Sequence, residues 1–328
     1  MIIAQSATTR RSAMPLCLQR TPNSSMDKHY NDFSSWLRQK LGCKVQKISI
    51  DAGFSCPNRD GTIGIGGCIF CDNRAFSPAY CMGNKSVGRQ MEDGISFFKR
   101  KYKDMKYLAY LQAFTNTYAS VEKMKSLYEE ALNVEDVVGI VIGTRPDCID
   151  DEILDYLESL SRQTFMIVEY GIESTDNAIL SRINRGHTFE CSVKAIERTK
   201  ERNIYVGGHV ILGLPGVSAE DNIKEAELLN STRLDILKLH QLQVVRSTRL
   251  AEEYERKPFK VYDIDEYIHL VASFIQHTRP DMVLDRFISQ SPAEMIVAPK
   301  WGIKNYEFAN ALDNYLARNN IYQGQLKK

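Results

Sequence analysis

The chain has little of what marks secreted, membrane or strongly charged proteins. Its 328 residues contain no apolar run long enough to cross a bilayer. Its eight cysteines are too sparse for a small disulfide-stapled scaffold. The net charge is only +1, which neither requires nor excludes nucleic acid, and no repeat or low-complexity tract is present. With 43% hydrophobic residues, the chain can form one large barrel or two ordinary domains.

The first 25 residues lack acidic side chains and a continuous apolar segment, so they do not resemble a secretory signal. They carry Arg10, Arg11 and Arg20 among several Ser and Thr, and only this composition supports a transit peptide. We expect residues 1–25 to be a disordered or misassigned extension, with Met26 as the true start. A cytoplasmic location is the matching expectation, because a reducing compartment preserves free thiols.

Three cysteines lie in one glycine-dense stretch, residues 53–71, which reads GFSCPNRDGTIGIGGCIFC. Cys56, Cys68 and Cys71 have no fourth cysteine at similarly tight spacing. Cysteine thiolates normally hold the irons of a cluster, and a catalytic metal keeps one position open. The glycines permit the positive φ values and close approaches that wrapping a cluster demands. The stretch therefore predicts an iron–sulfur cluster with one open iron.

Two other interpretations of these thiols remain open. A zinc knot would add Cys81 to the three, although zinc ribbons usually pair two short C-x-x-C hooks and only one exists here. Buried thiols can also gather in a turn without any ligand. The remaining cysteines form no second close-spaced motif, so we expect a single cluster; they are Cys17, Cys43, Cys81, Cys148 and Cys191.

From residue 45 onward, apolar runs of strand length alternate with charged segments of helical spacing. This alternation indicates βαβ units and a parallel sheet. Six units fall short of the eight that close a full barrel. We therefore expect an α/β fold, a partial (βα)6 TIM-type barrel over residues 26–260, with a short C-terminal α/β extension over residues 261–328. The expected strands cover residues 45–50, 107–114, 137–142, 165–170, 204–212, 236–245 and 284–288, and the expected helices cover 88–102, 121–132, 150–161, 188–202, 219–230, a segment from 262, and 306–319.

Unusual polar or glycine-rich segments follow the expected strands. The cysteine loop follows the first strand, and the next four strands are followed by TNTY (115–118), GTRPD (143–147), GIES (171–174) and GLPG (213–216). In barrels, active sites gather where loops leave the carboxyl ends of parallel strands. We expect these segments to converge at one end of the barrel.

These motifs, taken in order, resemble a known family. The spacing C-x11-C-x2-C, with Phe70 before the last cysteine, resembles the radical SAM superfamily. The series DAGFSCPNRDGTIG (51–64), TNTY, GTRPDC, RINRGH (182–187), GLPG and KLHQLQVVRST (238–248) resembles the YhcC-like family. That family is related to the radical SAM part of the Elongator catalytic subunit. The likeness runs from about residue 44 to the C-terminus.

The resemblance implies that Cys56, Cys68 and Cys71 ligate three irons of a [4Fe–4S] cluster, whose fourth iron binds S-adenosylmethionine (SAM). An electron from the reduced cluster would cleave the sulfonium C–S bond, giving methionine and a 5′-deoxyadenosyl radical that abstracts a hydrogen from substrate. The reducing partner would be a flavodoxin- or ferredoxin-like protein.

The resemblance also implies SAM contacts. Arg185 lies where relatives place a cation against the SAM carboxylate, although it could instead be a salt-bridged surface arginine. Glu173 lies where relatives contact the SAM ribose or amino group, although it could equally cap the next helix. Thr115, Asn116 and Thr117 replace the usual Gly-Gly-Glu stretch and are expected near the SAM ammonium.

Two histidines alternate into the barrel interior if the strands are placed correctly. His209 is expected to hold a ribose hydroxyl or shuttle a proton, with a hydrogen-bonded core histidine as the alternative. His240 is expected nearer the substrate. Further substrate-side candidates are Tyr118, Arg145 and Asp147, and Cys148 falls just past a strand end.

Two functional hypotheses follow. In the first, the chain is a radical SAM enzyme acting on RNA or on a small metabolite. The RNA version rests on the Elongator kinship and on the basic residues at 99–103 and 327–328, although such runs are usually solvated surface. In the second, it is a non-catalytic zinc-stabilised binding module, which explains the thiols but not the ordered motifs. Neither hypothesis involves a membrane.

Overall fold

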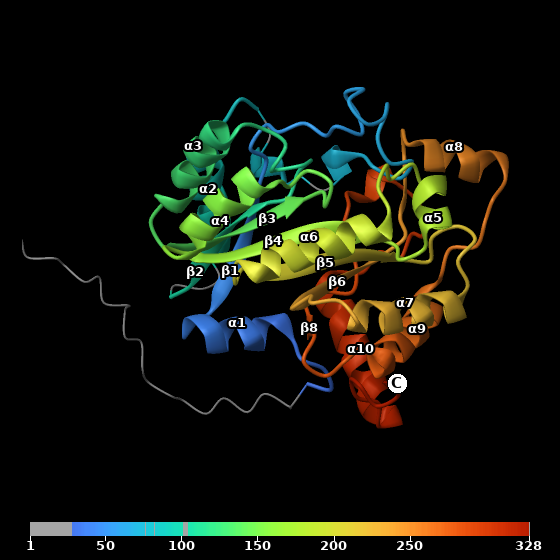
Figure 1. Cartoon of the computed structure of the whole chain (residues 1–328). Coiled ribbons are helices and arrows are strands. Elements are labelled where there is room, and N and C mark those ends of the chain that lie inside the picture. The colour runs from blue at the N-terminus through green and yellow to red at the C-terminus, as the bar shows by residue number, and fades with distance from the viewer. Residues whose placement is uncertain (1–27, 76, 82, 101–103, 328) are drawn as a thin grey trace, which may run out of the picture.

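The computed structural model describes residues 28–75, 77–81, 83–100 and 104–327, so the expected extension at residues 1–25 lies outside the described residues (Figure 1). Its main sheet has seven parallel strands in the order β1-β2-β3-β4-β5-β6-β8. The partial barrel is therefore confirmed, and the C-terminal part adds a seventh strand to the six expected in the core. The strands are β1 Val45–Ile50, β2 Lys106–Leu111, β3 Val137–Thr144, β4 Phe165–Glu173, β5 Tyr205–Leu212, β6 Ile236–Gln241 and β8 Val283–Leu284.

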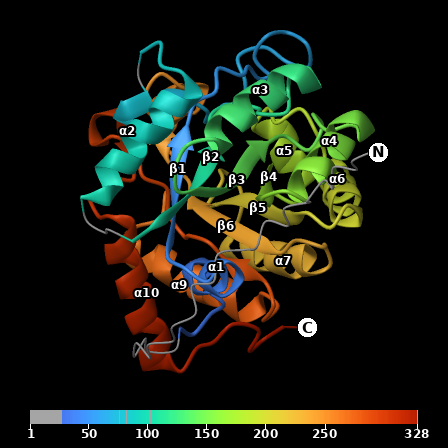
Figure 2. The same cartoon turned by 90° about the vertical axis from the view of Figure 1, so that its left-hand side faces the viewer.

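The helices that connect the first six strands pack around the outside of the sheet (Figure 2). Each of the five longer ones begins at a residue whose side chain accepts a backbone N–H of the first turn: Ser86, Ser120, Asp150, Thr188 and Ser218. Such caps satisfy donors that the first turn leaves unpaired, which is why each helix begins where it does. These helices are α2 Val87–Lys99, α3 Val121–Leu132, α4 Asp151–Ser161, α6 Phe189–Glu201 and α7 Ala219–Asn230.

The strand expected at residues 236–245 is wrong as a single element. β6 ends at Gln241, and β7 (Val244–Val245) instead pairs antiparallel with β9 (Ile296–Ala298). Leu242 and Val244 pack in a second apolar cluster with Ile69 of the cysteine loop, so burial draws the chain away from the main sheet. Likewise, β8 covers Val283–Leu284 in place of the expected residues 284–288.

Three helices were not expected: α1 (Phe33–Leu41), α5 (Asn177–Arg182) and α8 (Arg249–Arg256). α1 matters for the site because it covers the inner face of the sheet. Phe33 and Leu37 of α1 pack against inward-facing strand residues such as Leu108 and Val141, and this apolar cluster fills one end of the barrel. The interior beyond this cluster is lined by polar strand residues.

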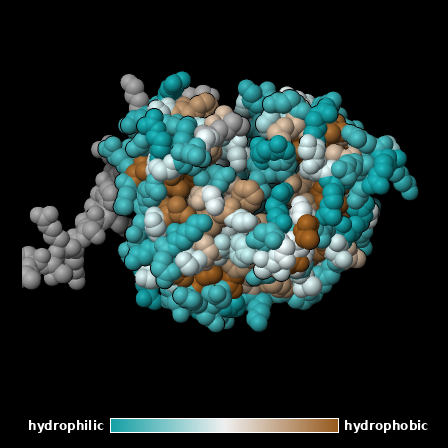
Figure 3. Space-filling view, turned by 90° about the horizontal axis from the view of Figure 1, so that it is seen from above, coloured by the Kyte–Doolittle hydropathy of each residue, from teal (hydrophilic) through white to brown (hydrophobic). Residues whose placement is uncertain are grey.

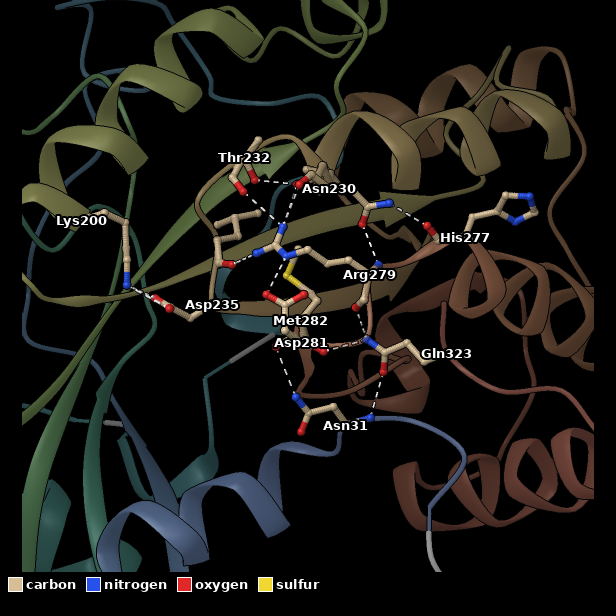
Figure 4. Close-up of polar contacts among 12 residues, drawn as sticks. Asn31, Lys200, Asn230, Thr232, Asp235, His277, Arg279, Asp281, Met282 and Gln323 are labelled. Carbon is tan, nitrogen blue, oxygen red and sulfur yellow. Dashed lines mark hydrogen bonds and ion pairs between the residues drawn. The ribbon is translucent and has the colours of Figure 1, made fainter. Parts of the chain in front are cut away.

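The C-terminal elements include α9 (Ile264–His277) and α10 (Asn305–Asn319), and none of the helices in the described ranges is both long and apolar enough to span a membrane. The guanidinium of Arg279, just after α9, lies at the centre of a set of carbonyl oxygens (Figure 4). It donates to the carbonyls of Leu229 and Asn230 at the end of α7, and of Thr232 and Leu234 in the connection from α7 to β6. The extension is thus fastened to the barrel through backbone groups, while its predicted boundary at residue 260 remains a prediction.

Replacing Arg279 by Met should lower the free energy of unfolding by about 2–4 kcal/mol, because several carbonyls would lose a charged donor. Chemical denaturation of both proteins measures the difference. Arg233→Met, at an exposed position in the same connection, is the matched control and should change stability by less than about 0.5 kcal/mol. Equal effects of the two substitutions would contradict the structural role of Arg279.

Candidate active site

One cavity of about 180 Å³ collects residues from the cysteine loop and from the carboxyl-terminal part of strands β2 to β6. Cys56, Cys68 and Cys71 all line it. The cysteine loop lies at the top of Figure 1, and Figure 3 views the molecule from that side. In Figure 3, white and brown side chains gather toward the middle of the face within a mostly teal margin. The expected convergence of the strand-end segments is thus seen for most, but not all, of the predicted residues.

The cysteine loop is held by the segment that follows α5. Asn58 Nδ2 donates to the carbonyl of Asn184 at 2.6 Å, and Asn184 Nδ2 donates to the carbonyl of Gly67 at 2.8 Å. The backbone N–H of Ile69 donates to the carbonyl of Ile183 at 3.0 Å. A Cβ at Gly64 would lie 2.3 Å from Asn58 Oδ1, so a larger residue there would displace the Asn58 amide. Residues far apart in sequence therefore set the positions of the thiols.

Arg185 lies against this loop and is buried. Its Nη2 donates to the carbonyl of Gly171 at 2.6 Å, and its Nη1 lies 3.6 Å from Cys68 Sγ. A Cβ at position 171 would lie 2.5 Å from Arg185 Nη2, so a larger residue at that position of β4 would displace the guanidinium. Arg185 Nε is buried without a hydrogen-bond partner among the described residues. The guanidinium is fixed beside a thiol and keeps one donor available.

Glu173 ends β4 beside Arg185, with 3.6 Å between Glu173 Oε1 and Arg185 Nη2. Its φ of 69° is a left-handed conformation that non-glycine residues seldom adopt, and a register shift lies just before it. Burial raises the pKa of its carboxyl group, although Arg185 acts in the opposite direction. Such backbone strain is common where a side chain must be aimed at a ligand.

The segment after β2 is only partly directed at the cavity. Thr115 lines it, and its Oγ1 is buried without a partner in the described part of the chain. Asn116 Nδ2 donates to the carbonyls of Leu111 and Gly143, and Thr117 Oγ1 lies 2.6 Å from Thr144 Oγ1. Tyr118 Oη contacts Thr62 Oγ1 at 2.8 Å. Asn116, Thr117 and Tyr118 are not among the residues that line the cavity.

Arg145, at the end of β3, does line the cavity. It forms a bidentate ion pair with Asp147, at 2.8 and 2.6 Å. Burial disfavours the charged carboxylate, but the Arg145 guanidinium holds the pKa of Asp147 below its usual value. Arg145 Nη1 is buried and has no partner within the described ranges, so this side chain also keeps a donor free.

Deeper in the cavity, a buried carboxylate joins several strands. Glu169 of β4 lies 2.7 Å from both Lys238 Nζ of β6 and His209 Nε2 of β5, and 3.4 Å from Lys47 Nζ of β1. Burial opposes the charge, but Lys238 and Lys47 keep the pKa of Glu169 well below its usual value. The sequence prediction missed Glu169 and Lys238, although each is a lone charge within an apolar strand, in FMIVEY and ILKLH. That pattern marks a buried, paired charge.

His209 and His240 both line the cavity, and their rings lie 5.2 Å apart. Burial and the Lys238 charge lower the pKa of His209 to about 4 despite the Glu169 carboxylate, so the imidazole is neutral at pH 7. Because Glu169 accepts the Nε2 proton, His209 Nδ1 is left as an acceptor. His240 contacts Ser289 through Nδ1, and its Nε2 is buried without a partner among the described residues.

Cys81 does not join the three cavity thiols. It is buried, its Sγ donates to the carbonyl of Ser49 at 3.3 Å, and it is absent from the cavity lining. Cys148 is also absent from the lining, and burial raises the pKa of its thiol to about 12. No group of three or more His, Cys, Asp or Glu side chains in the described ranges surrounds a single metal-ion position. This geometry gives no support to a four-cysteine zinc knot.

The depressed pKa of His209 predicts a dependence of stability on pH. In the unfolded chain this imidazole protonates below its ordinary pKa of 6.5, whereas in the folded protein it stays neutral to about pH 4. The free energy of unfolding should therefore fall as pH decreases from 7.5 to 5.0. His209→Gln should reduce this fall by about 2 kcal/mol.

Denaturation of the wild type and of His209→Gln at both pH values measures this difference. His269→Gln, at an exposed position of α9, is the matched control. An unchanged pH dependence in His209→Gln would show that the folded protein does not hold this imidazole neutral.

Comparisons with known proteins agree with this geometry. A family model described as the radical SAM superfamily matches residues 56–229, and one described as the Radical_SAM C-terminal domain matches residues 234–318. Uncharacterized protein YtqA of Bacillus subtilis is 35% identical over 306 residues, 93% of this chain and 94% of its own length. Protein YhcC of Escherichia coli is 33% identical over 297 residues, 90% of this chain and 95% of its length.

Two further matches, both from Methanocaldococcus infernus, cover less of the matched protein. A tRNA uridine(34) acetyltransferase of Methanocaldococcus infernus is 29% identical over 210 residues, 61% of this chain and 38% of that protein. The solved structure of Methanocaldococcus infernus Elp3, lacking residues 1–46, has a TM-score of 0.65 at 19% identity. The structural match covers 85% of this chain and 64% of the solved chain, and it shows a shared fold. The predicted family is confirmed: this chain belongs to the radical SAM superfamily of enzymes, as a relative of YhcC and YtqA.

Proposed function

We propose that this enzyme cleaves SAM reductively at a [4Fe–4S] cluster held by Cys56, Cys68 and Cys71. The observation that carries the proposal is that these three thiols line one cavity together with Arg185 and Glu173. When bound, the reduced cluster supplies the electron that breaks the sulfonium bond of SAM and so gives a 5′-deoxyadenosyl radical. A flavodoxin- or ferredoxin-like protein is the reductant that we propose.

The residues present fit both groups. A cluster separates its thiolates more widely than a single ion does, which suits three cysteines that share a cavity without surrounding one ion position. Thr115 Oγ1, Arg145 Nη1 and Arg185 Nε are buried polar atoms without partners among the described residues. Buried polar atoms are normally hydrogen-bonded, so these three favour a polar ligand in the cavity.

The chain's own residues would bind and orient SAM. The guanidinium of Arg185 suits a carboxylate, and Glu173 suits an ammonium group. Neutral His209 offers Nδ1 as an acceptor for a hydroxyl, and the Glu169 contact fixes its tautomer.

RNA is the substrate class that we propose first, with a small metabolite as the alternative. The observation that favours RNA is the partial similarity to a protein named as a tRNA uridine(34) acetyltransferase. The basic run expected to contact RNA lies partly outside the described residues, at 101–103 and 328. Turnover assays with total RNA and with small-molecule extracts separate the two classes.

Cys68→Ala should abolish both the cluster absorbance and the formation of 5′-deoxyadenosine. The protein is reconstituted anaerobically with iron and sulfide, reduced with dithionite and supplied with SAM, and the product is measured by chromatography. Cys81→Ala is the matched control and should retain both signals. Product formation by Cys68→Ala would rule out the proposed ligand set, and loss of the cluster in Cys81→Ala would favour a four-cysteine site.

Arg185→Gln should weaken SAM binding by about 10- to 100-fold, because a charge-assisted hydrogen bond to the carboxylate would be lost. Equilibrium dialysis with labelled SAM measures binding, and the cluster absorbance checks that the site has formed. Arg182→Gln, at an exposed position three residues earlier, is the control. Unchanged affinity in Arg185→Gln would contradict the carboxylate role.

A further inference from the structure

A second, larger cavity of about 910 Å³ lies where the barrel does not close. Its lining comes from β1, one edge of the sheet, from the segment that follows β8, the other edge, and from α2 with the segment before it. Gln46 and Lys47 contribute from β1, and Arg286 and Gln290 contribute from the segment after β8. Gln112 lines both this cavity and the one that contains the three thiols. We call the larger cavity the mouth.

Only some of the charged side chains that line the mouth have an ion-pair partner among the described residues. Lys47 pairs with Asp285 at 2.5 Å, and Asp93 pairs with Lys85 at 2.9 Å and with Arg89 at 3.1 Å. Arg286, in contrast, has no ion pair and no side-chain hydrogen bond with any described residue, and its Nε is buried. Arg286 is only partly exposed, and a guanidinium that loses hydration without gaining a partner is destabilising. An unpaired one in a cavity therefore points to a ligand that supplies the missing charge.

Arg286 is also close to the thiol-containing cavity. Its carbonyl accepts the N–H of Leu239 at 2.9 Å, which places its backbone beside His240 on β6. Its positive charge is among the causes that lower the pKa of both His240 and His209, after burial in each case. A molecule that contacts Arg286 from the mouth can therefore extend past Gln112 to the histidines.

We propose that Arg286 forms an oxyanion subsite, which binds a phosphate or carboxylate group of the substrate while the rest of that substrate reaches the cavity of the three thiols. The role of this group as part of a substrate rests on the proposed function. The amide groups of Gln46, Gln112 and Gln290 line the same mouth and provide further donors. The guanidinium fork suits either oxyanion, because both accept two parallel hydrogen bonds.

The test measures binding of inorganic phosphate and of acetate to the reconstituted, unreduced protein at constant ionic strength. Phosphorus relaxation reports phosphate binding, and proton saturation transfer reports acetate binding. At least one anion should bind the wild type. In Arg286→Gln its dissociation constant should rise by at least about tenfold, and Arg286→Lys should recover part of the loss. The anion that binds more tightly identifies the chemical group.

Two further variants locate the binding. Arg162→Gln removes the same charge from an exposed pair at the end of α4 and should bind like the wild type. Arg185→Gln reports anions that enter the thiol cavity instead. The proposal is overturned if neither anion binds, or if Arg286→Gln binds the anion as tightly as the wild type. It is also overturned if Arg162→Gln loses as much anion affinity as Arg286→Gln, or if Arg185→Gln is the only variant that loses affinity.

These measurements need no turnover of SAM, so the two proposals can fail separately. If an anion binds at Arg286 but no 5′-deoxyadenosine forms, the subsite stands and the proposed function is ruled out. If the enzyme forms 5′-deoxyadenosine but Arg286→Gln leaves the anion affinity unchanged, the proposed function stands and the subsite is ruled out. The Arg286 side chain forms no hydrogen bond or ion pair with any described residue, so its variants should fold, and their unfolding transitions verify this.

Discussion

The Glu169 carboxylate sits in the barrel interior, where it contacts two lysines and a histidine from three other strands. Lys238, His209 and Lys47 surround it, and Asp285 in turn contacts both lysines. A buried charge is tolerated only when it is closely paired, so these side chains must keep their relative positions. The network thereby fixes the spacing of β1, β4, β5 and β6, and it neutralises both lysines. The Glu169 contact also sets the tautomer of His209, so the network determines which ring nitrogen of His209 can accept a hydrogen bond in the thiol cavity.

The cysteine loop depends on a different part of the chain. Backbone and amide groups of Ile183 and Asn184 hold it, and Arg185 follows directly in sequence with its guanidinium beside Cys68. The same short segment thus positions the thiols and supplies the cation that we assign to SAM. A distortion of this segment would disturb both together. The arrangement explains why RINRGH is recognisable as a motif, although only some of its side chains face the cavity.

The sequence was sufficient for the barrel because each strand and helix carries a local signal, namely an apolar run or a capping residue. It was also sufficient to single out the three thiols, which share one loop. It was not sufficient for Asn116 and Thr117, whose side chains bind Leu111, Gly143 and Thr144 only once β2 and β3 are adjacent. Nor could it show where β6 ends, because Leu242 to Val245 are as apolar as a continuing strand. Glu169 and Lys238 were visible as single charges, but their pairing depends on the strand order.

The unclosed side of the barrel separates two sets of residues along the chain. Apart from Ser289, the residues that line the thiol cavity come from residues 56–243, whereas Arg286 and Gln290 at the mouth come from the segment after β8. Substitutions in that later segment can change the shape and charge of the entrance and leave every neighbour of Cys56, Cys68 and Cys71 intact. A few substitutions along this one edge of the sheet can therefore change which molecules enter, while the core around the thiols is retained.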